Sequence, residues 1–149
     1  MWGMIISIIS GILMSVQGVF NTEVTKQTSV WVSASFVQFT ALLVCFFAWF
    51  VTGREGAFSA ISHVKPGYLL LGGTIGAFIT YTVIVSMNHL GPAKAVLFII
   101  AAQILAAYLI ELFGLFGVKK AGFDWMKLVG ILVFIGGMIL FKWKELTVK

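Results

Sequence analysis

The chain alternates long apolar stretches with short polar segments. The five apolar stretches cover residues 2–22, 29–51, 67–88, 92–113 and 125–143. Each has about the 20 residues that an α-helix needs to cross the roughly 30 Å hydrocarbon core of a bilayer. An open sheet cannot span lipid, and the alternating polar residues of a membrane β-barrel are absent here. The pattern therefore predicts an all-α protein with five transmembrane helices.

The tryptophans support these boundaries. All five lie at the ends of apolar stretches, as Trp2, Trp31, Trp49, Trp125 and Trp143. Indole rings prefer the headgroup level, with the apolar body inward and the N–H group toward water. Trp31 and Trp49 are 18 residues apart, as are Trp125 and Trp143, and this spacing corresponds to about 27 Å of helix. That length is close to the hydrocarbon thickness.

The composition agrees with a membrane protein. The 149 residues are 60% hydrophobic and 10% charged, and the mean hydropathy is +1.08. A soluble domain is roughly 45–50% apolar and about 25% charged, and one of this length could not hide so much apolar surface in a single core. We therefore expect one transmembrane domain over residues 1–149, with the lipid bilayer as its surroundings.

No motif in the sequence indicates enzyme chemistry. A phosphate-binding loop, a Cys-x-x-Cys pair, a His-x-x-x-His pair and a nucleophile elbow are all missing. His63 and His89 lie far apart in predicted loops, and Cys45 stands alone in an apolar stretch. The net charge of +5 includes no basic run longer than Lys119–Lys120, so we expect no nucleic-acid partner. We also expect no catalytic residues, no metal site and no cofactor.

The basic residues divide equally between the two sides of the predicted membrane domain. The side of the N-terminus carries Arg54, Lys65, Lys119, Lys120 and Lys127, and the other side carries Lys26, Lys94, Lys142, Lys144 and Lys149. A bias in Lys and Arg sets the orientation of a membrane protein. A chain without this bias is expected to insert in both directions and to pair as an antiparallel homodimer. The alternative is one orientation fixed by another signal.

A second argument for dimerisation comes from the number of helices. Five helices are too few to enclose a substrate path, whereas two inverted copies build the inverted-repeat architecture found in many transporters. Gly130 and Gly137 are seven residues apart on one stripe of the last apolar stretch. Small residues let helices approach closely in lipid, so this pair forms either the seam between two copies or a contact within one chain.

Several polar side chains lie inside the apolar stretches, where they are costly and therefore informative. Gln17 and Asn21 share one face of the first stretch, and they either bind substrate or form a hydrogen bond between helices. Tyr81 either lines a cavity or fills one. Gln103 and Glu111 share a face of the fourth stretch. These five residues are the predicted substrate contacts.

Glu111 is the only acidic residue well inside a predicted span. A carboxyl group removed from water binds a proton more readily. Glu111 is therefore the candidate for exchanging a proton against a cationic substrate. The alternative is that it reaches the membrane interface or pairs with Lys119 or Lys120.

Five short segments, taken in order, resemble a known family. They are Ser-Val-Gln-Gly-Val-Phe-Asn-Thr (15–22), Leu-Gly-Gly-Thr-Ile-Gly-Ala-Phe (71–78), Asn-His-Leu-Gly-Pro-Ala (88–93), Ala-Ala-Gln (101–103) and Leu-Ile-Glu-Leu-Phe-Gly (109–114). The chain resembles the YdcZ-like family of five-span proteins within the drug/metabolite transporter superfamily. The resemblance implies a multi-pass exporter of the bacterial inner membrane. Glu111 stands where the family commonly has Asp, which preserves the carboxylate, while Lys94 near the predicted cavity mouth disfavours a cationic substrate.

The superfamily also contains the four-span small multidrug resistance proteins, which are antiparallel dimers with paired glycines seven apart in the last span. Gly130 and Gly137 resemble that seam. The span-one glutamate of those proteins is missing, because the middle of the first span offers Gln17. Together these features predict a homodimeric transporter that exports a small organic metabolite or drug by alternating access, with proton coupling at Glu111. The alternatives are a dual-topology passive ion channel and a non-transporting subunit of a larger membrane assembly.

Overall fold

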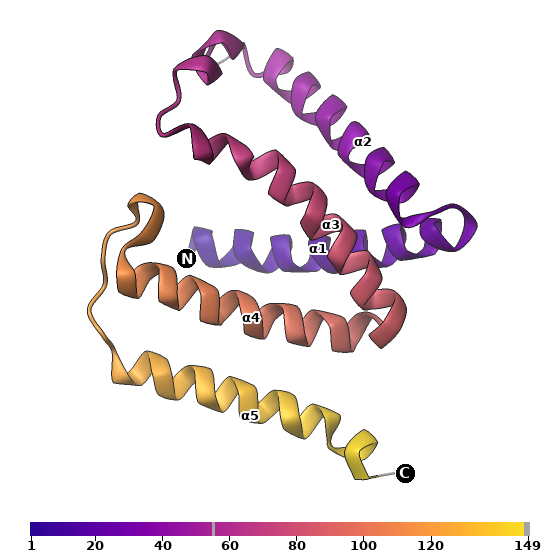
Figure 1. Cartoon of the computed structure of the whole chain (residues 1–149), viewed down its shortest axis with the longest axis vertical. Coiled ribbons are helices and arrows are strands. Elements are labelled where there is room, and N and C mark those ends of the chain that lie inside the picture. Colours follow the sequence, from indigo (N-terminus) through magenta and orange to yellow (C-terminus); the bar gives the residue numbers. More distant parts are fainter. Residues whose placement is uncertain (55, 148–149) are drawn as a thin grey trace. The chain divides into compact units, whose positions relative to one another are not determined.

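The computed structural model describes residues 1–54 and 56–147, with side chains as far as Phe141. Within these residues the chain forms α1 (Trp2–Gln27), α2 (Val30–Val51), α3 (Gly72–Leu90), α4 (Pro92–Phe113) and α5 (Trp125–Thr147), shown in Figure 1. Short 3-10 helices lie in the connections, as η1 (Phe58–His63), η2 (Gly67–Leu71) and η3 (Leu115–Gly117). The described residues contain no strand, which confirms the all-α prediction.

Four of the described helices are long and apolar enough to cross a membrane. They are α1, α2, the continuous segment Gly67–Leu90 formed by η2 and α3, and α4. The apolar part of α5 that the structure describes, Trp125–Phe141, is shorter. Most large apolar side chains on these helices are exposed in the isolated chain, as expected when lipid covers them. A fifth span ending at residue 143 stays a prediction, because the side chain of Trp143 lies outside the described residues.

Local interactions explain where the helices begin and end. α1 continues past residue 22 to Gln27, and within these turns the hydroxyls of Thr22 and Thr25 donate to main-chain carbonyls four residues earlier. α2 begins after Ser29, whose Oγ accepts a hydrogen bond from the Val32 amide at 3.2 Å, as an N-cap residue does. Gly91, with φ of +77°, ends α3. Pro92 then begins α4, where its missing N–H group costs nothing.

The described chain divides into two compact units, Met1–Pro92 and Ala93–Lys149. In the first unit, α1, α2 and α3 contact one another pairwise. Gly18 of α1 faces Met87 and Val83 of α3, and Ser33 of α2 donates through Oγ to the Asn21 carbonyl of α1 at 3.0 Å. The core of this unit therefore lies where the C-terminal halves of α1 and α3 meet the start of α2.

The second unit is a helical hairpin. α5 runs back in the direction opposite to α4 (Figure 1). α4 ends at Phe113. Gly114 follows with φ of +67°, the left-handed conformation that glycine adopts readily after a helix. The Ala121 amide then donates to the Glu111 carbonyl at 2.8 Å, which closes the connection. A single membrane domain over both units stays a prediction.

Candidate functional site at the α4–α5 hairpin

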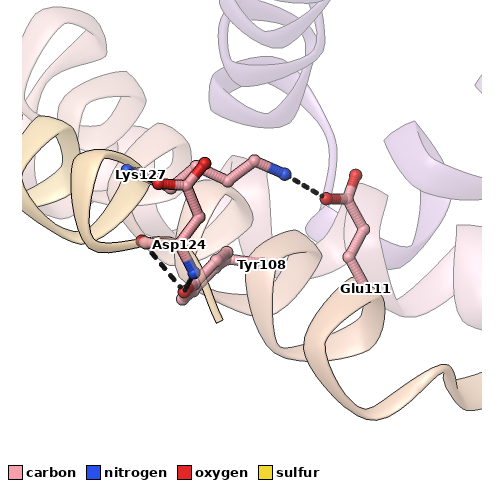
Figure 2. Close-up of polar contacts among 4 residues, drawn as sticks. All are labelled: Tyr108, Glu111, Asp124 and Lys127. Carbon is pink, nitrogen blue, oxygen red and sulfur yellow. Dashed lines mark hydrogen bonds and ion pairs between the residues drawn. The ribbon is translucent and has the colours of Figure 1, made fainter. Parts of the chain in front are cut away.

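Four polar residues gather where α4 ends and α5 begins, and we name them the hairpin cluster. Tyr108 and Glu111 come from the last two turns of α4, Asp124 precedes α5, and Lys127 lies in its first turn. Figure 2 shows their side chains converging from the two helices. The cluster combines two carboxylates, an ammonium group and a phenol at one end of the hairpin.

Asp124 and Tyr108 fix the start of α5 against α4. The Asp124 Oδ1 atom accepts hydrogen bonds from the amides of Met126 at 2.8 Å and Lys127 at 3.4 Å, as an N-cap side chain does. The Tyr108 hydroxyl accepts from the Asp124 amide and donates to the Asp124 carbonyl, both at 3.4 Å. The Asp124 carboxylate therefore caps the N-terminus of α5.

Glu111 and Lys127 form an ion pair across the hairpin. The Lys127 Nζ atom lies 2.9 Å from Glu111 Oε2, and Figure 2 shows this direct contact. The two side chains are 46% and 47% exposed. Such a charge-assisted hydrogen bond is stronger than a neutral one. The alternative interpretation had Glu111 at the membrane interface or paired with Lys119 or Lys120. In the structure the lysine that reaches the carboxylate is Lys127, from the first turn of α5.

One signal in the sequence points to Lys127. The first turn of a helix favours acidic side chains, since its free N–H groups carry partial positive charge. A lysine there needs a compensating partner, and Glu111 supplies it. Sequence reasoning missed the pair because the 16 residues between Glu111 and Lys127 include a connection whose path the pattern does not determine.

The arrangement differs from a solitary carboxyl group removed from water. Glu111 is half-exposed in the isolated chain and its charge is balanced by Lys127. The pair presents one negative and one positive group side by side. Among the described residues, no three His, Cys, Asp or Glu side chains gather as a metal site requires.

In the first unit, Asn21 and Gln17 lie in different surroundings. Asn21 is 7% exposed, and its carbonyl accepts from the hydroxyls of Ser33 at 3.0 Å and Thr25 at 2.8 Å. The contact between α1 and α2 therefore runs through the backbone of Asn21. Gln17 is exposed.

Tyr81 of α3 stacks on Trp31 of α2. The ring centroids are 4.6 Å apart and the planes meet at 23°, an offset geometry that aromatic pairs favour. Two turns further along α2, Gln38 donates through Nε2 to the Thr80 hydroxyl at 3.5 Å. The tryptophan predicted as an interfacial anchor thus also makes a contact between helices.

Gln103 lies on α4, exposed and two turns before Glu111. The first unit contains Gln17, Asn21 and Tyr81, and the second contains Gln103 and Glu111. Within the described residues, no hydrogen bond joins two members of this set inside either unit. Their role as substrate contacts stays a prediction.

Gly130 and Gly137 lie on an open part of α5. Both are exposed, and a Cβ atom built at either would meet no other atom within 4 Å. A second helix can therefore approach the backbone closely at these positions, as a seam of small residues requires.

Residues 2–140 match the model of a family described as "Putative inner membrane exporter, YdcZ". The matched region contains α1 to α4, most of α5, and every residue predicted to bind substrate or to form the dimer seam. Comparisons with curated proteins and with solved structures give no match.

Proposed function

Because the chain belongs to the YdcZ family of inner membrane exporters, we propose that it exports a small organic metabolite or drug by alternating access. The match confirms the resemblance inferred from the sequence. It is also the single observation that carries this proposal, since it covers nearly the whole chain. The four described membrane-length helices support a multi-pass protein, and we place it in the bacterial inner membrane.

The proposed unit of function is an antiparallel homodimer. Five spans in each copy, related by inversion, would form a ten-helix inverted repeat with a central path. Two features support this: the open backbone at Gly130 and Gly137, and the equal division of ten basic residues between the two sides that the five-span prediction defines. The glycines are the proposed seam between the copies.

The exposed amides support a polar path. Gln17 and Gln103 lie on apolar helices and are exposed in the isolated chain. Within the described residues, neither side chain makes a hydrogen bond. Amides facing hydrocarbon without a partner are costly, so such residues usually face a water-filled cavity or another helix. We propose that they contact substrate, together with Asn21, Tyr81 and Glu111.

We further propose that Glu111 couples transport to protons. In this proposal the Glu111 carboxylate either binds a proton or pairs with Lys127. A proton on the carboxylate removes the charge that holds Lys127, so protonation and pairing exclude one another. Protonation would then favour a conformation in which the contact between Glu111 and Lys127 is open.

Flux measurements on purified protein in liposomes test the proposal. A panel of labelled small metabolites and drugs is loaded inside, and efflux is compared with that from empty liposomes. We expect saturable efflux of at least one solute at rates limited by conformational steps of μs–ms. Non-saturating ion flux at far higher rates would instead establish a passive channel. The absence of flux for every solute and ion would establish a non-transporting subunit.

A further inference from the structure

The ion pair of the hairpin cluster presents two accessible charges of opposite sign. Asp124 accepts hydrogen bonds from the amides of Met126 and Lys127 through Oδ1, and its charge acts on Lys127 without a direct ion pair. Glu111 and Lys127 are each about half-exposed. They are held by one direct contact at 2.9 Å and come from different helices. A solute can therefore reach both charges by opening this contact.

Charge balance limits which solutes can open it. A simple cation would bind Glu111 and take away the direct ion-pair partner of the Lys127 ammonium. A simple anion would bind Lys127 and take away the partner of the Glu111 carboxylate. A charge that loses its direct partner close to the apolar part of a membrane is disfavoured. A solute that carries both charges satisfies both residues at once and leaves the net charge of the site unchanged.

The surroundings are compatible with such an exchange. Lys127 has a flexible four-carbon stem, and its ammonium can turn toward a new acceptor without movement of the backbone. The contacts of Tyr108 with Asp124 hold the start of α5 while the ion pair opens. The other cations of the connection, Lys119 and Lys120, are exposed, and no ion pair with Glu111 is formed by either within the described residues.

From this geometry we infer that the exported solute is a zwitterion. Its cationic group binds the Glu111 carboxylate and its anionic group binds the Lys127 ammonium, so that the solute takes the place of the contact between them. The inference rests on the proposed function and adds the substrate class.

Three small solutes of different charge, each built on a two-carbon chain, test the inference in proteoliposomes. Taurine is a zwitterion, choline is a permanent cation and isethionate is a permanent anion, and all three cross a bare bilayer slowly. We expect taurine efflux to exceed that of choline and isethionate at least tenfold. Equal or faster flux of choline or isethionate overturns the zwitterion inference and leaves the exporter standing.

The general solute panel tests the inference if the substrate is larger than these three probes. If none of the three probes moves, the charge class of the solutes that the panel identifies gives the answer. Zwitterions among them support the inference, and simple ions or uncharged solutes overturn it. Absence of flux for every solute instead overturns the proposed function itself.

Substitutions of the pair sharpen the test. Glu111→Gln leaves Lys127 alone and should shift selectivity toward isethionate, whereas Lys127→Gln should shift it toward choline. The double substitution Glu111→Lys with Lys127→Glu restores a neutral pair and should recover at least half of the zwitterion preference. Glu23→Gln is the matched control, because Glu23 forms a similarly exposed pair with Lys26 at 2.6 Å on α1. Unchanged selectivity in both single variants overturns the inference, and the double variant guards against simple misfolding.

Discussion

Gly18 of α1 faces the side chain of Met87 on α3. A Cβ atom on Gly18 would lie 2.5 Å from the Met87 Cε atom and 2.8 Å from its Sδ atom, and Met87 is only 3% exposed. The glycine thus allows the two helices to approach closely, as small residues do at helix contacts in membranes.

Replacement of Gly18 by valine should destabilise the first unit. The added side chain must displace Met87 from a packed position, and such overpacking costs about 1–3 kcal/mol. Thermal unfolding in detergent, followed by circular dichroism, measures the change. Gly11→Val is the matched control, since it lies on the same helix and a Cβ there meets nothing within 4 Å. Equal unfolding temperatures for the two variants would contradict this account of the α1–α3 contact.

Substitutions in the stacked pair of Tyr81 and Trp31 distinguish a packing role of Tyr81 from a role in substrate binding. Tyr81→Phe keeps the ring contact, and within the described residues the tyrosine hydroxyl makes no hydrogen bond. We therefore expect a change in unfolding free energy within about 0.5 kcal/mol. If the hydroxyl binds substrate, efflux at low solute concentration should fall several-fold. Trp31→Ala should instead lower stability, because it removes the stacking partner. Unchanged efflux in Tyr81→Phe would show that the Tyr81 hydroxyl does not bind substrate.

The dimer seam is tested by a pair of adjacent glycines. Gly137→Leu places a large side chain on the proposed seam, whereas Gly136→Leu points in a different direction on the same helix. A Cβ at either glycine meets no atom within 4 Å, so neither substitution clashes within the chain. Cross-linking in liposomes should show loss of dimer in Gly137→Leu and retention in Gly136→Leu. Equal dimer fractions would exclude Gly137 from the seam.

Dual topology is tested by labelling from one side of the membrane. Cys45→Ala first removes the native thiol, and a single cysteine is then introduced at Ser62 in the connection between α2 and α3. An impermeant maleimide added outside sealed cells should label about half of the molecules. Labelling of all or none would show a fixed orientation and contradict the antiparallel dimer.

The amino-acid pattern predicts the helices far better than it predicts their contacts. The apolar stretch at 92–113 coincides with α4 because Pro92 and the glycine at 114 limit it on both sides. The first stretch ends too early in the prediction, since hydropathy falls after residue 22 whereas the polar turn up to Gln27 is still helical. Hydropathy locates the apolar part of a helix and not its polar ends.

The candidate site shows the same limit. The carboxylate at 111 stands out in the sequence because charge is rare in an apolar stretch. Its partner does not, because the connection from Gly114 to Asp124 decides which lysine reaches it. Trp31 likewise fits an interfacial anchor by position, whereas its stack on Tyr81 depends on how α2 and α3 cross.

Proton movement driven by solute export tests the central claim most directly. Proteoliposomes with a pH-sensitive dye inside are given a gradient of the transported solute, and the internal pH is followed. Wild-type protein should produce a solute-dependent pH change, Glu23→Gln should retain it, and Glu111→Gln should abolish it while the dimer remains intact. An unchanged proton signal in Glu111→Gln would contradict the role of Glu111, and the absence of any solute-dependent signal in the wild-type protein would contradict proton-coupled export.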